Sequence, residues 1–322
     1  MRELSVLIKK PEAIRSSEIT PKELYLNRRK FLAGMALTGA AAATGFGLKN
    51  LITPSPAFAG QKIDGIQKSA FSTNEKITPF VDVTHYNNYY EFSTEKEEPA
   101  SLAKNFKTRP WTVTIDGAVK KKQVLDVDSI IKFAAPEERI YRHRCVEGWS
   151  IVVPWIGFSL SELIKRAEPL GKAKFVEFTT IYDLKQMPGQ RRNVLEWPYV
   201  KGLRLDEAMH PLALLCFGMY GEELPNQDGA PLRVVIPWKY GFKSAKAIVR
   251  IRFIEKQPMT TWNLANAAAY GFYSNVNPDV DTYHSQASER RLGEFRPRRT
   301  LMFNGYDQVA GLYSGMDLRK HY

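Results

Sequence analysis

Alternating apolar and polar residues along the middle of the chain predict a series of short β-strands. WTVTIDG at 111–117 alternates, turns at an Asp-Gly pair, and continues through KKQVLDVDSIIKF into a short helix that Asp126 or Asp128 would cap. Four later segments have the apolar character of strands: AKFVEFTTIYD, LALLCFGMYG, APLRVVIPW and AKAIVRIRFIEK. Together they predict a protein built largely on β-sheets.

Helical spacing is confined to short stretches between these strands. FSLSELIKRAEPLG repeats apolar residues at helical spacing, with Ser159 or Ser161 as the cap and Pro169 and Gly171 as the stop. LRLDEAMHP predicts a shorter helix that Pro211 would end. Strands and helices follow each other without a regular βαβ alternation, and neither a GxGxxG fingerprint nor a P-loop occurs in the sequence. We therefore expect an α+β fold with mixed sheets.

The same pattern divides the chain into four parts. Residues 60–108 are polar, show no sustained period and predict an irregular arm packed on the core. Residues 109–257 carry the strand pattern of the core, and residues 258–322, rich in Asn, Tyr and Arg, predict an extension that wraps the same domain. VPWIGF at 153–158 is echoed by IPWKYGF at 236–242, and we expect both segments to converge on one site.

Residues 1–59 have the order of an export signal. Arg28 and Arg29 precede a mildly apolar run of Ala and Gly, and Ala57 and Ala59 supply the small residues of a cleavage site. The paired arginines resemble a twin-arginine (Tat) signal. The alternative, a membrane anchor, would need about 20 strongly apolar residues, which this run lacks. We expect a cleaved signal and a periplasmic protein, delivered by a route that carries folded, cofactor-loaded chains.

Charge and composition narrow the class further. Apolar residues make up 44% of the sequence, which is ordinary for a globular protein. Loss of residues 1–59 would lower the formal net charge from +12 to +7, so the remaining chain stays basic. Export makes nucleic acid an improbable partner for this charge, which leaves an anionic ligand, an anionic surface or a solvated basic face.

The most unusual stretch is YRHRCVEGWS at 141–150, where a cysteine follows three basic residues. Arg142, His143 and Arg144 are expected to lower the pKa of the Cys145 thiol, because nearby positive charge favours the thiolate. A thiolate serves as a nucleophile, a redox centre or a metal ligand. Cys216 lies in an apolar run and is read as a small buried hydrophobe, although pairing with Cys145 stays open.

Each use of a thiolate needs different companions. A Cys-His hydrolase remains open, with His210 or His284 as its base. The five histidines are too scattered for a zinc site, and the CxxC of a dithiol redox centre is absent from the sequence. A metal bound mostly by a cofactor, with one sulfur from the protein, is compatible with the sequence. Molybdenum held by a pterin dithiolene fits that description.

A second basic cluster occurs in DGAPLRVVIPWKYGFKSAKAI at 228–248. Its cations and flexible positions could receive the phosphate of a large anionic cofactor; they are Arg233, Lys239, Lys243 and Lys246, around Gly229, Gly241 and Ser244. The alternative is a solvated charged loop. Taken alone, this segment is a moderate signal for an anion site.

Several motifs together resemble one known family. RHRCVEGWSIVVPWIGFSL, QDGAPLRVVIPWKYGFKSAK, TTWN, YGFYSNVNP and MFNGY are similar to segments of the periplasmic protein-methionine-sulfoxide reductase catalytic subunits, from about residue 77 to the C-terminus. These are molybdopterin enzymes of the sulfite oxidase superfamily. The resemblance implies a sulfite-oxidase-type fold, one Mo-molybdopterin per chain, and repair of methionine sulfoxide in periplasmic proteins.

The resemblance also implies a set of site residues. Cys145 matches the cysteine that ligates molybdenum, and we take it as the catalytic side chain. The positions that match cofactor contacts are Asn87, Tyr90, Glu91, Thr180, Asp228, Arg233, Ser244, Ala245 and Lys246. Asp228 stands where relatives have Asn, so it offers acceptors where an amide could also donate.

A partner follows from the same resemblance. The chain contains no CxxCH haem motif, so its electrons would arrive from outside; the family implies a haem-containing integral membrane subunit that draws on the quinone pool. Two rival functions are kept. One is a molybdopterin oxidoreductase that acts on sulfite or on other S- or N-oxides. The other is a periplasmic protein that binds an anion through Arg233, Lys239 and Lys246.

Overall fold

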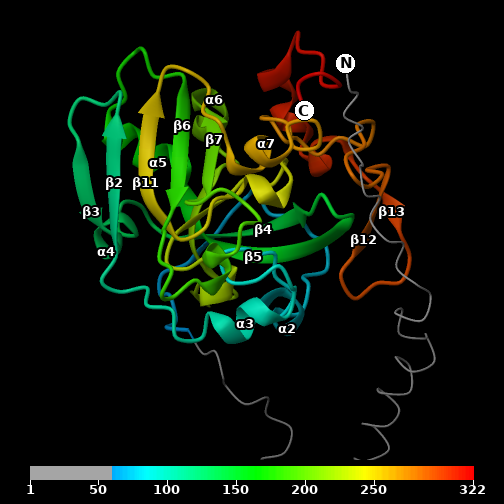
Figure 1. The fold of residues 1–322 in the computed structure, drawn as a ribbon, viewed down its shortest axis with the longest axis horizontal. Coiled ribbons are helices and arrows are strands. Elements are labelled where there is room, and N and C mark those ends of the chain that lie inside the picture. The colour runs from blue at the N-terminus through cyan, green and yellow to red at the C-terminus, as the bar shows by residue number, and fades with distance from the viewer. Residues whose placement is uncertain (1–59) are drawn as a thin grey trace, which may run out of the picture. The chain divides into compact units, whose positions relative to one another are not determined.

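Two β-sheets form the frame of the protein, whose computed structural model describes residues 60–322 (Figure 1). One sheet has the strand order β3-β2-β11-β6-β7. Its strands are β2 (Thr112–Gly117), β3 (Gln123–Asp126), β6 (Phe175–Thr180), β7 (Val200–Arg204) and β11 (Ile248–Ile254). β11 runs parallel to β2 and antiparallel to β6, so the sheet is mixed. This arrangement confirms the expected α+β class with mixed sheets.

The second sheet carries the long hairpin that contains the cysteine motif. β4 (Glu137–Arg144) and β5 (Trp149–Ser159) pair antiparallel from Glu137↔Gly157 to Arg144↔Ser150. Around this hairpin lie β1 (Gln67–Lys68), β8 (Leu214–Met219), β9 (Glu222–Glu223), β10 (Arg233–Val235), β12 (Ser288–Arg291) and β13 (Arg298–Arg299). β5 is shared: its first residues pair with β12 and its last with β8.

The strands form where the sequence pattern predicted them. In β6 the residues alternate between half-buried and buried, with Val176, Phe178 and Thr180 pointing inward, as a strand with one covered face requires. Every residue of β8 is buried, which matches the unbroken apolar run in LALLCFGMYG. Cys216 in this strand is fully buried and free, as is the other cysteine, so they form no disulfide.

The helices are short and lie at the ends of strands. They are α2 (Phe80–Thr84), α3 (Glu98–Leu102), α4 (Val127–Ile130), α5 (Leu160–Ala167), α6 (Leu205–Met209) and α7 (Thr261–Ala265). Asp126 caps α4, its side chain accepting from the Asp128 backbone N–H at 2.8 Å. α5 starts after Ser159 and ends at Glu168, whose left-handed conformation (φ 47°) precedes Pro169.

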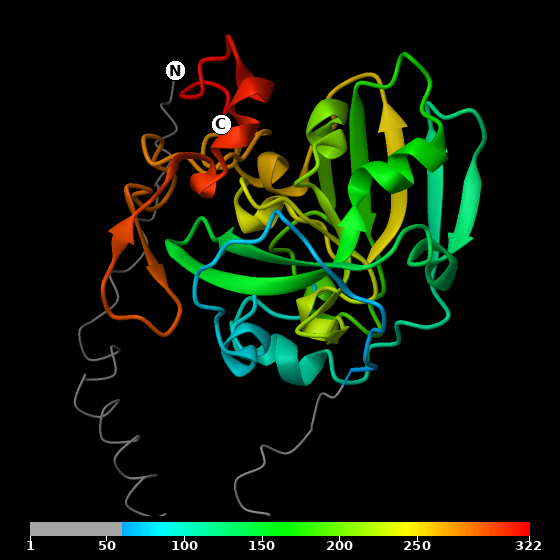
Figure 2. The same ribbon diagram turned by 180° about the vertical axis from the view of Figure 1, so that it is seen from behind.

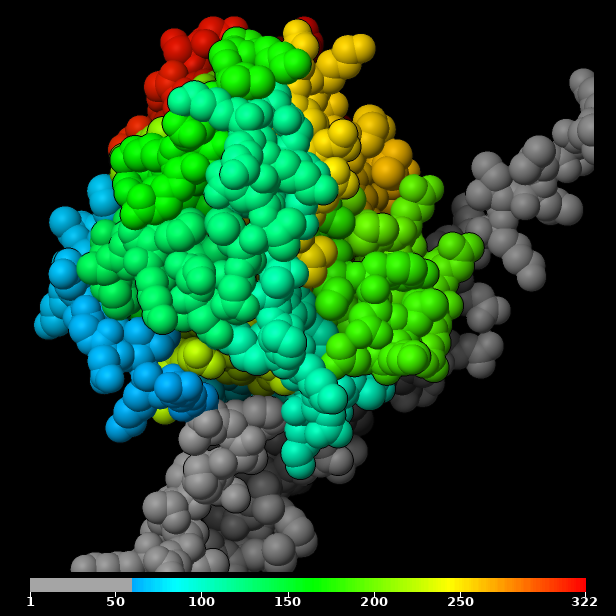
Figure 3. All heavy atoms as spheres, turned by 90° about the vertical axis from the view of Figure 1, so that its left-hand side faces the viewer, coloured from blue at the N-terminus to red at the C-terminus, as the bar shows by residue number. Residues whose placement is uncertain are grey.

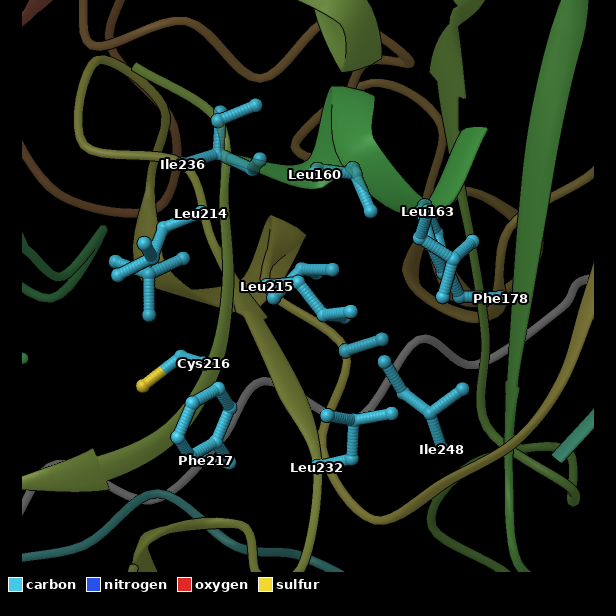
Figure 4. Close-up of a cluster of buried hydrophobic side chains, with 14 of the residues drawn as sticks. Leu160, Leu163, Phe178, Leu214, Leu215, Cys216, Phe217, Leu232, Ile236 and Ile248 are labelled. Atoms are coloured by element: carbon cyan, nitrogen blue, oxygen red, sulfur yellow. The ribbon is translucent and has the colours of Figure 1, made fainter. Parts of the chain in front are cut away.

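One continuous hydrophobic core joins the two sheets through α5. Figure 4 shows Leu160 and Leu163 of α5 near Phe178 of β6, with Leu214 and Leu215 of β8 on the other side. Figure 2 shows α5 from the side of the molecule on which it lies. Burial of these apolar side chains holds the hairpin β4–β5 at a fixed place beside the five-stranded sheet.

Residues 60–108, which we expect to form an irregular arm on the core, contain three short regular elements. β1 adds a short parallel strand to β4, and α2 and α3 pack below the β4–β5 hairpin (Figure 1). The periodicity of these elements escaped detection because none is longer than five residues. Glu75 of this segment pairs with Arg142 of β4 and with Arg291 of β12, which ties the arm to both.

The C-terminal part runs along the outer edge of the second sheet. It contains α7, the β12–β13 hairpin and the 3₁₀ helices η7 (Met302–Gly305) and η8 (Asp307–Tyr313). The opposite side of the molecule, seen in Figure 3, is covered by the β2–β3 region. The predicted signal at 1–59, with Arg28 and Arg29, lies outside the described residues. Within residues 60–322, no helix is long and apolar enough to cross a bilayer.

Candidate active site

Cys145 sits at the tip of the β4–β5 hairpin, in a four-residue turn at 145–148. The Cys145 N–H donates to the Trp149 carbonyl at 2.9 Å, and the Gly148 N–H donates to the Cys145 carbonyl at 3.1 Å. Gly148 adopts φ 88°, which a residue with a side chain rarely does, so the tight turn depends on glycine here. The turn leaves Cys145 only 7% exposed, with its side chain facing a cavity.

The cavity is large and is built from distant parts of the chain. It encloses about 930 Å³, its open mouth included. The arm contributes residues 83–91, the hairpin contributes residues from His143 to Trp155, and the segments 227–246 and 262–270 contribute further lining residues. Trp155, Gly241 and Phe242 all line it, which confirms that the two echoed segments converge on one site.

Most of the sequence-predicted site residues meet at this cavity. Those that line it are Asn87, Tyr90, Glu91, Cys145, Asp228, Arg233 and Lys246. Thr180, Ser244 and Ala245 do not line it but lie directly behind. The Thr180 hydroxyl donates to the Lys246 carbonyl at 2.8 Å, and the Ala245 carbonyl accepts from Val234 at 3.0 Å. These contacts hold the backbone from which Lys246 projects.

Unpartnered polar atoms test whether a cofactor suits the cavity. Six buried side-chain atoms of its lining have no hydrogen-bond partner among the described residues: Asn87 Oδ1, Glu91 Oε1, Trp155 Nε1, Gln227 Oε1, Asp228 Oδ2 and Arg233 Nε. Buried polar atoms are rarely left unpaired in folded proteins. Acceptors and donors both occur in this set, so the lining fits a group with ring nitrogens, amino groups and a phosphate, as molybdopterin has.

Two cations stand at the inner end of the cavity. Arg233 lies over the Trp155 ring at 4.7 Å and donates to the Asp228 carbonyl at 2.7 Å. Lys246 donates to the Asn88 carbonyl at 2.6 Å, and burial lowers its pKa to about 8. Burial also lowers the pKa of Arg233 and raises that of Asp228 to about 7. A bound anion would favour the charged form of both cations.

The other two cations of the second basic cluster point elsewhere, which corrects the sequence-based expectation. Lys239 is fully buried in an ion pair with Glu207 at 2.6 Å, and Lys243 donates to the Phe272 carbonyl. The tight turn around η6 (Gly241–Lys243) directs both away from the cavity, so the proposed anion set of Arg233, Lys239 and Lys246 is not assembled.

The expected effect of the basic motif on Cys145 is also wrong. Burial raises the pKa of the Cys145 thiol to about 12 and outweighs the lowering effects of Lys96 and Arg144. Arg142 is engaged by Glu75, and Arg144 by Glu289 at 3.0 Å. Burial lowers the pKa of His143 to about 3, so its imidazole is neutral. The three basic residues therefore serve the hairpin's structure and add little charge at the sulfur.

A hydrogen-bond network around the sulfur was missed by sequence reasoning. The Asn88 amide donates to Cys145 Sγ at 3.3 Å, and the Glu147 backbone N–H donates to the same sulfur at 3.4 Å. Lys96 donates to the side-chain Oδ1 of Asn88 and to Glu147 Oε1, the latter at 2.8 Å, while Trp149 Nε1 donates to Glu147 Oε2 at 2.9 Å. Because Lys96 engages the amide oxygen, the NH₂ group of Asn88 is turned toward the sulfur.

Aromatic rings form the outer wall of the cavity. The ring centroid of Trp262 lies 4.6 Å from that of Tyr270 and 5.3 Å from that of Tyr90. The ring centroids of Phe242 and Tyr270 are 5.1 Å apart. Aromatic faces and edges make favourable contacts with sulfur and methyl groups. The only signals for this wall in the sequence were the TTWN and YGFYSNVNP motifs. A thioether-like group entering the mouth would pass along these rings.

Comparison with known proteins places this site in a class. The model of the oxidoreductase molybdopterin binding domain matches residues 100–262, which include Cys145, Arg233 and Lys246. The chain is therefore a member of the molybdopterin-binding oxidoreductases, and its two mixed sheets agree with the expected α+β class. Among solved structures, the sulfane dehydrogenase SoxCD from Paracoccus pantotrophus aligns over 67% of this chain and 57% of its own, with a TM-score of 0.45 and 16% identity.

Curated relatives identify the family. The protein-methionine-sulfoxide reductase catalytic subunit MsrP of Ralstonia nicotianae is 55% identical over 96% of this chain and 96% of its own. The MsrP proteins of Burkholderia mallei and Pseudomonas syringae pv. tomato are 53% and 52% identical, over 95% and 98% of this chain and over 95% and 100% of their own. This chain belongs to the family of protein-methionine-sulfoxide reductase catalytic subunits.

Proposed function

We propose that this chain reduces methionine sulfoxide in proteins, using one Mo-molybdopterin held in the cavity beside Cys145. The observation that carries the proposal is the cavity lining: a cysteine sulfur, the buried Arg233, the half-buried Lys246 and six unpartnered polar atoms face one hollow. Relatives at 52–55% identity are named for this activity, which supports the same assignment here.

The residues divide the work of holding the cofactor. Arg233 and Lys246 would receive its anionic end, and Asn87, Glu91 and Asp228 would pair with its polar groups. Cys145 Sγ would ligate the metal, as a soft ligand. When bound, the cofactor supplies two-electron chemistry that removes the sulfoxide oxygen as water, with two protons and two electrons consumed for each thioether released.

Side chains of the protein would orient the cysteine sulfur and shield the substrate from water. Asn88 and the Glu147 backbone N–H hold the cysteine sulfur in place by donating to it. The aromatic wall of Trp262, Tyr270 and Phe242 would receive the methyl and methylene groups next to the sulfoxide and exclude water from them. Together these groups would favour a sulfoxide with an apolar side over a small hydrophilic anion.

We further propose that the chain works in the periplasm after twin-arginine export and receives electrons from a haem-containing membrane subunit fed by the quinone pool. The sequence order around Arg28 and Arg29 supports export. The relatives' designation as catalytic subunits supports a separate electron-donating subunit. Oxidised periplasmic proteins would then be the substrates.

The test is an activity and metal assay on protein matured with its cofactor machinery. The purified protein should contain molybdenum and should reduce a methionine-sulfoxide peptide with reduced benzyl viologen, while sulfite with an electron acceptor should give no turnover. Cys145→Ser should abolish the reduction, whereas Cys216→Ser, a change of the same kind at a buried cysteine that does not line the cavity, should retain it. Turnover of sulfite alone, or full activity in Cys145→Ser, would refute the proposal.

A further inference from the structure

The β12–β13 hairpin, residues 288–299, stands out from the edge of the second sheet (Figure 1). Its two strands pair at Ser288↔Arg299 and Glu289↔Arg298. Between the strands, Phe295 is 78% exposed, the highest value among the exposed large hydrophobic side chains of the described residues. Single apolar side chains are common on protein surfaces, so Phe295 gains meaning here only together with the charged residues of the same hairpin.

The hairpin is also strongly and asymmetrically charged. Its acidic residues are engaged within the protein: Glu289 pairs with Arg144, and Glu294 pairs with Arg298. Three further arginines are exposed and have no acidic partner among residues 60–322; they are Arg290, Arg296 and Arg299. The hairpin therefore carries one exposed aromatic side chain and three unpaired positive charges.

This surface is joined directly to the turn that carries Cys145. β12 runs parallel to the start of β5, with Arg290 opposite Trp149, and the Arg290 N–H donates to the Gly148 carbonyl at 2.8 Å. Just before the hairpin, the Gln286 amide donates to the Val146 carbonyl at 2.7 Å. One backbone hydrogen bond therefore separates the exposed hairpin from the turn at 145–148.

The proposed function requires a donor to bring electrons close to that turn. Electron-transfer partners form small, weak contacts in which complementary charge steers the encounter. A hairpin with three unpaired arginines and one exposed aromatic side chain suits such a contact and requires an acidic face on the partner. The bond to the Cys145 turn favours a protein that must approach the metal ligand over a lipid surface, which would gain nothing from that position.

We propose that the β12–β13 hairpin is the docking surface for the electron-donating protein, which binds it through an acidic face. The proposal rests on the proposed function. On docking, the donor is oxidised, and the two electrons it gives up pass to the cofactor beside Cys145. Protons are taken from water and need no path through the hairpin.

Charge reversal separates docking from catalysis. The variant Arg290→Glu/Arg296→Glu/Arg299→Glu changes only the exposed cations. The matched control, Lys120→Glu/Lys121→Glu/Lys122→Glu, makes the same change in net charge on the β2–β3 side shown in Figure 3. Electrons are supplied either by the host's detergent-solubilised membrane fraction reduced with a quinol, or by reduced benzyl viologen, a small dye that needs no docking surface.

We expect the hairpin variant to lose about tenfold or more of the membrane-driven rate at low salt and to keep its dye-driven rate. The control should keep both, and the wild-type membrane-driven rate should fall as salt rises. Reduction of the molybdenum centre, followed by its EPR signal without any sulfoxide, gives the same comparison. That readout holds even if the enzyme's substrate is not a sulfoxide.

Two results would overturn the docking proposal. One is an equal membrane-driven rate in the hairpin and control variants. The other is binding of wild-type protein, but not of the hairpin variant, to phosphatidylglycerol vesicles in sedimentation, with the rate in lipid-free detergent unchanged; the hairpin would then contact lipid. Failure of the dye-driven sulfoxide assay alone would refute the proposed function and leave the EPR comparison to decide the docking.

Discussion

Replacing Lys239 by methionine should destabilise the protein strongly while leaving the cavity lining intact. The Lys239 ammonium is fully buried and contacts Glu207 Oε1 at 2.6 Å, the Tyr273 carbonyl at 2.8 Å, Asn275 Oδ1 at 2.8 Å and the Tyr313 hydroxyl at 3.0 Å. Methionine fills much of the same volume. It leaves the Glu207 carboxylate buried without a cation.

Removing one partner of a buried pair typically costs about 3–5 kcal/mol. For a folded unit of this size, each kcal/mol lowers the melting temperature by roughly 2–4 °C, so Lys239→Met should melt about 6–20 °C below wild type at pH 7. Lys243→Met is the matched control, because Lys243 is equally buried but bonds a carbonyl and leaves no carboxylate behind. The melting temperature of Lys243→Met should fall clearly less than that of Lys239→Met.

The pH dependence gives a second readout. Burial alone would raise the pKa of Glu207, but the charges of Lys239 and Lys243 and the bonds from Lys239 and Tyr313 hold it below its ordinary 4.5. In wild type, the ionised Glu207 carboxylate contributes to the free energy of unfolding above pH 4.5, and this contribution is lost as the pH falls through the lower pKa of the folded state. In Lys239→Met the carboxyl would take up a proton readily, so the gap in melting temperature should narrow between pH 7 and pH 4.5.

Differential scanning calorimetry of the single variants and of Glu207→Leu/Lys239→Met checks the reasoning. Replacing both charges by apolar groups should recover most of the loss, since such replacements of buried pairs are often close to neutral. The reasoning fails if Lys239→Met melts within 2 °C of wild type, or if the double variant is no more stable than the single one.

Two further predictions concern the site. In cofactor-free protein, burial raises the pKa of Asp228 from 3.8 to about 7. Between these two pH values the folded state keeps a proton that the unfolded chain releases, so the free energy of unfolding falls as the pH rises. Asp228→Asn should therefore melt at a higher temperature than wild type at pH 8 but not at pH 4. Equal pH dependence in both proteins would contradict this. Lys96→Met should release the Asn88 amide and remove a positive charge near Cys145, which lowers the midpoint potential of the molybdenum centre by tens of millivolts in an EPR titration. Lys96→Arg should restore most of the midpoint potential. An unchanged potential in Lys96→Met would refute the role given to Lys96 near the metal site.

The parts of the fold that followed from the sequence are those with a local cause. β2, β6, β8 and β11 were predictable because alternating or continuous apolar residues mark strands. α5 was predictable from Ser159 and Pro169 at its ends. The lining of the cavity by Arg233, Asp228 and Lys246 followed from family resemblance, since no local pattern indicates which side chains converge from distant segments.

What escaped prediction depends on tertiary contacts of polar residues. Lysines and arginines are normally expected at the surface, so the buried positions of Lys239, Lys243 and Arg144 could not be read from the chain. The same limitation produced the wrong pKa for Cys145, because the extent of its burial was not visible in YRHRCVEGWS. Asn88 reaches the cysteine sulfur, and Lys96 reaches Asn88, through contacts between the arm and the hairpin that the sequence does not show.

The turn at 145–148 accepts hydrogen bonds from residues near both ends of the described chain. Asn88 reaches it from the arm, while Gln286 and Arg290 reach it from within the last forty or so residues. During synthesis, the hydrogen bonds around this turn can therefore all form only after residue 290 has left the ribosome. A chain truncated before residue 286 would lack two of the residues that hold the turn, and we expect it to retain a cofactor at Cys145 less well.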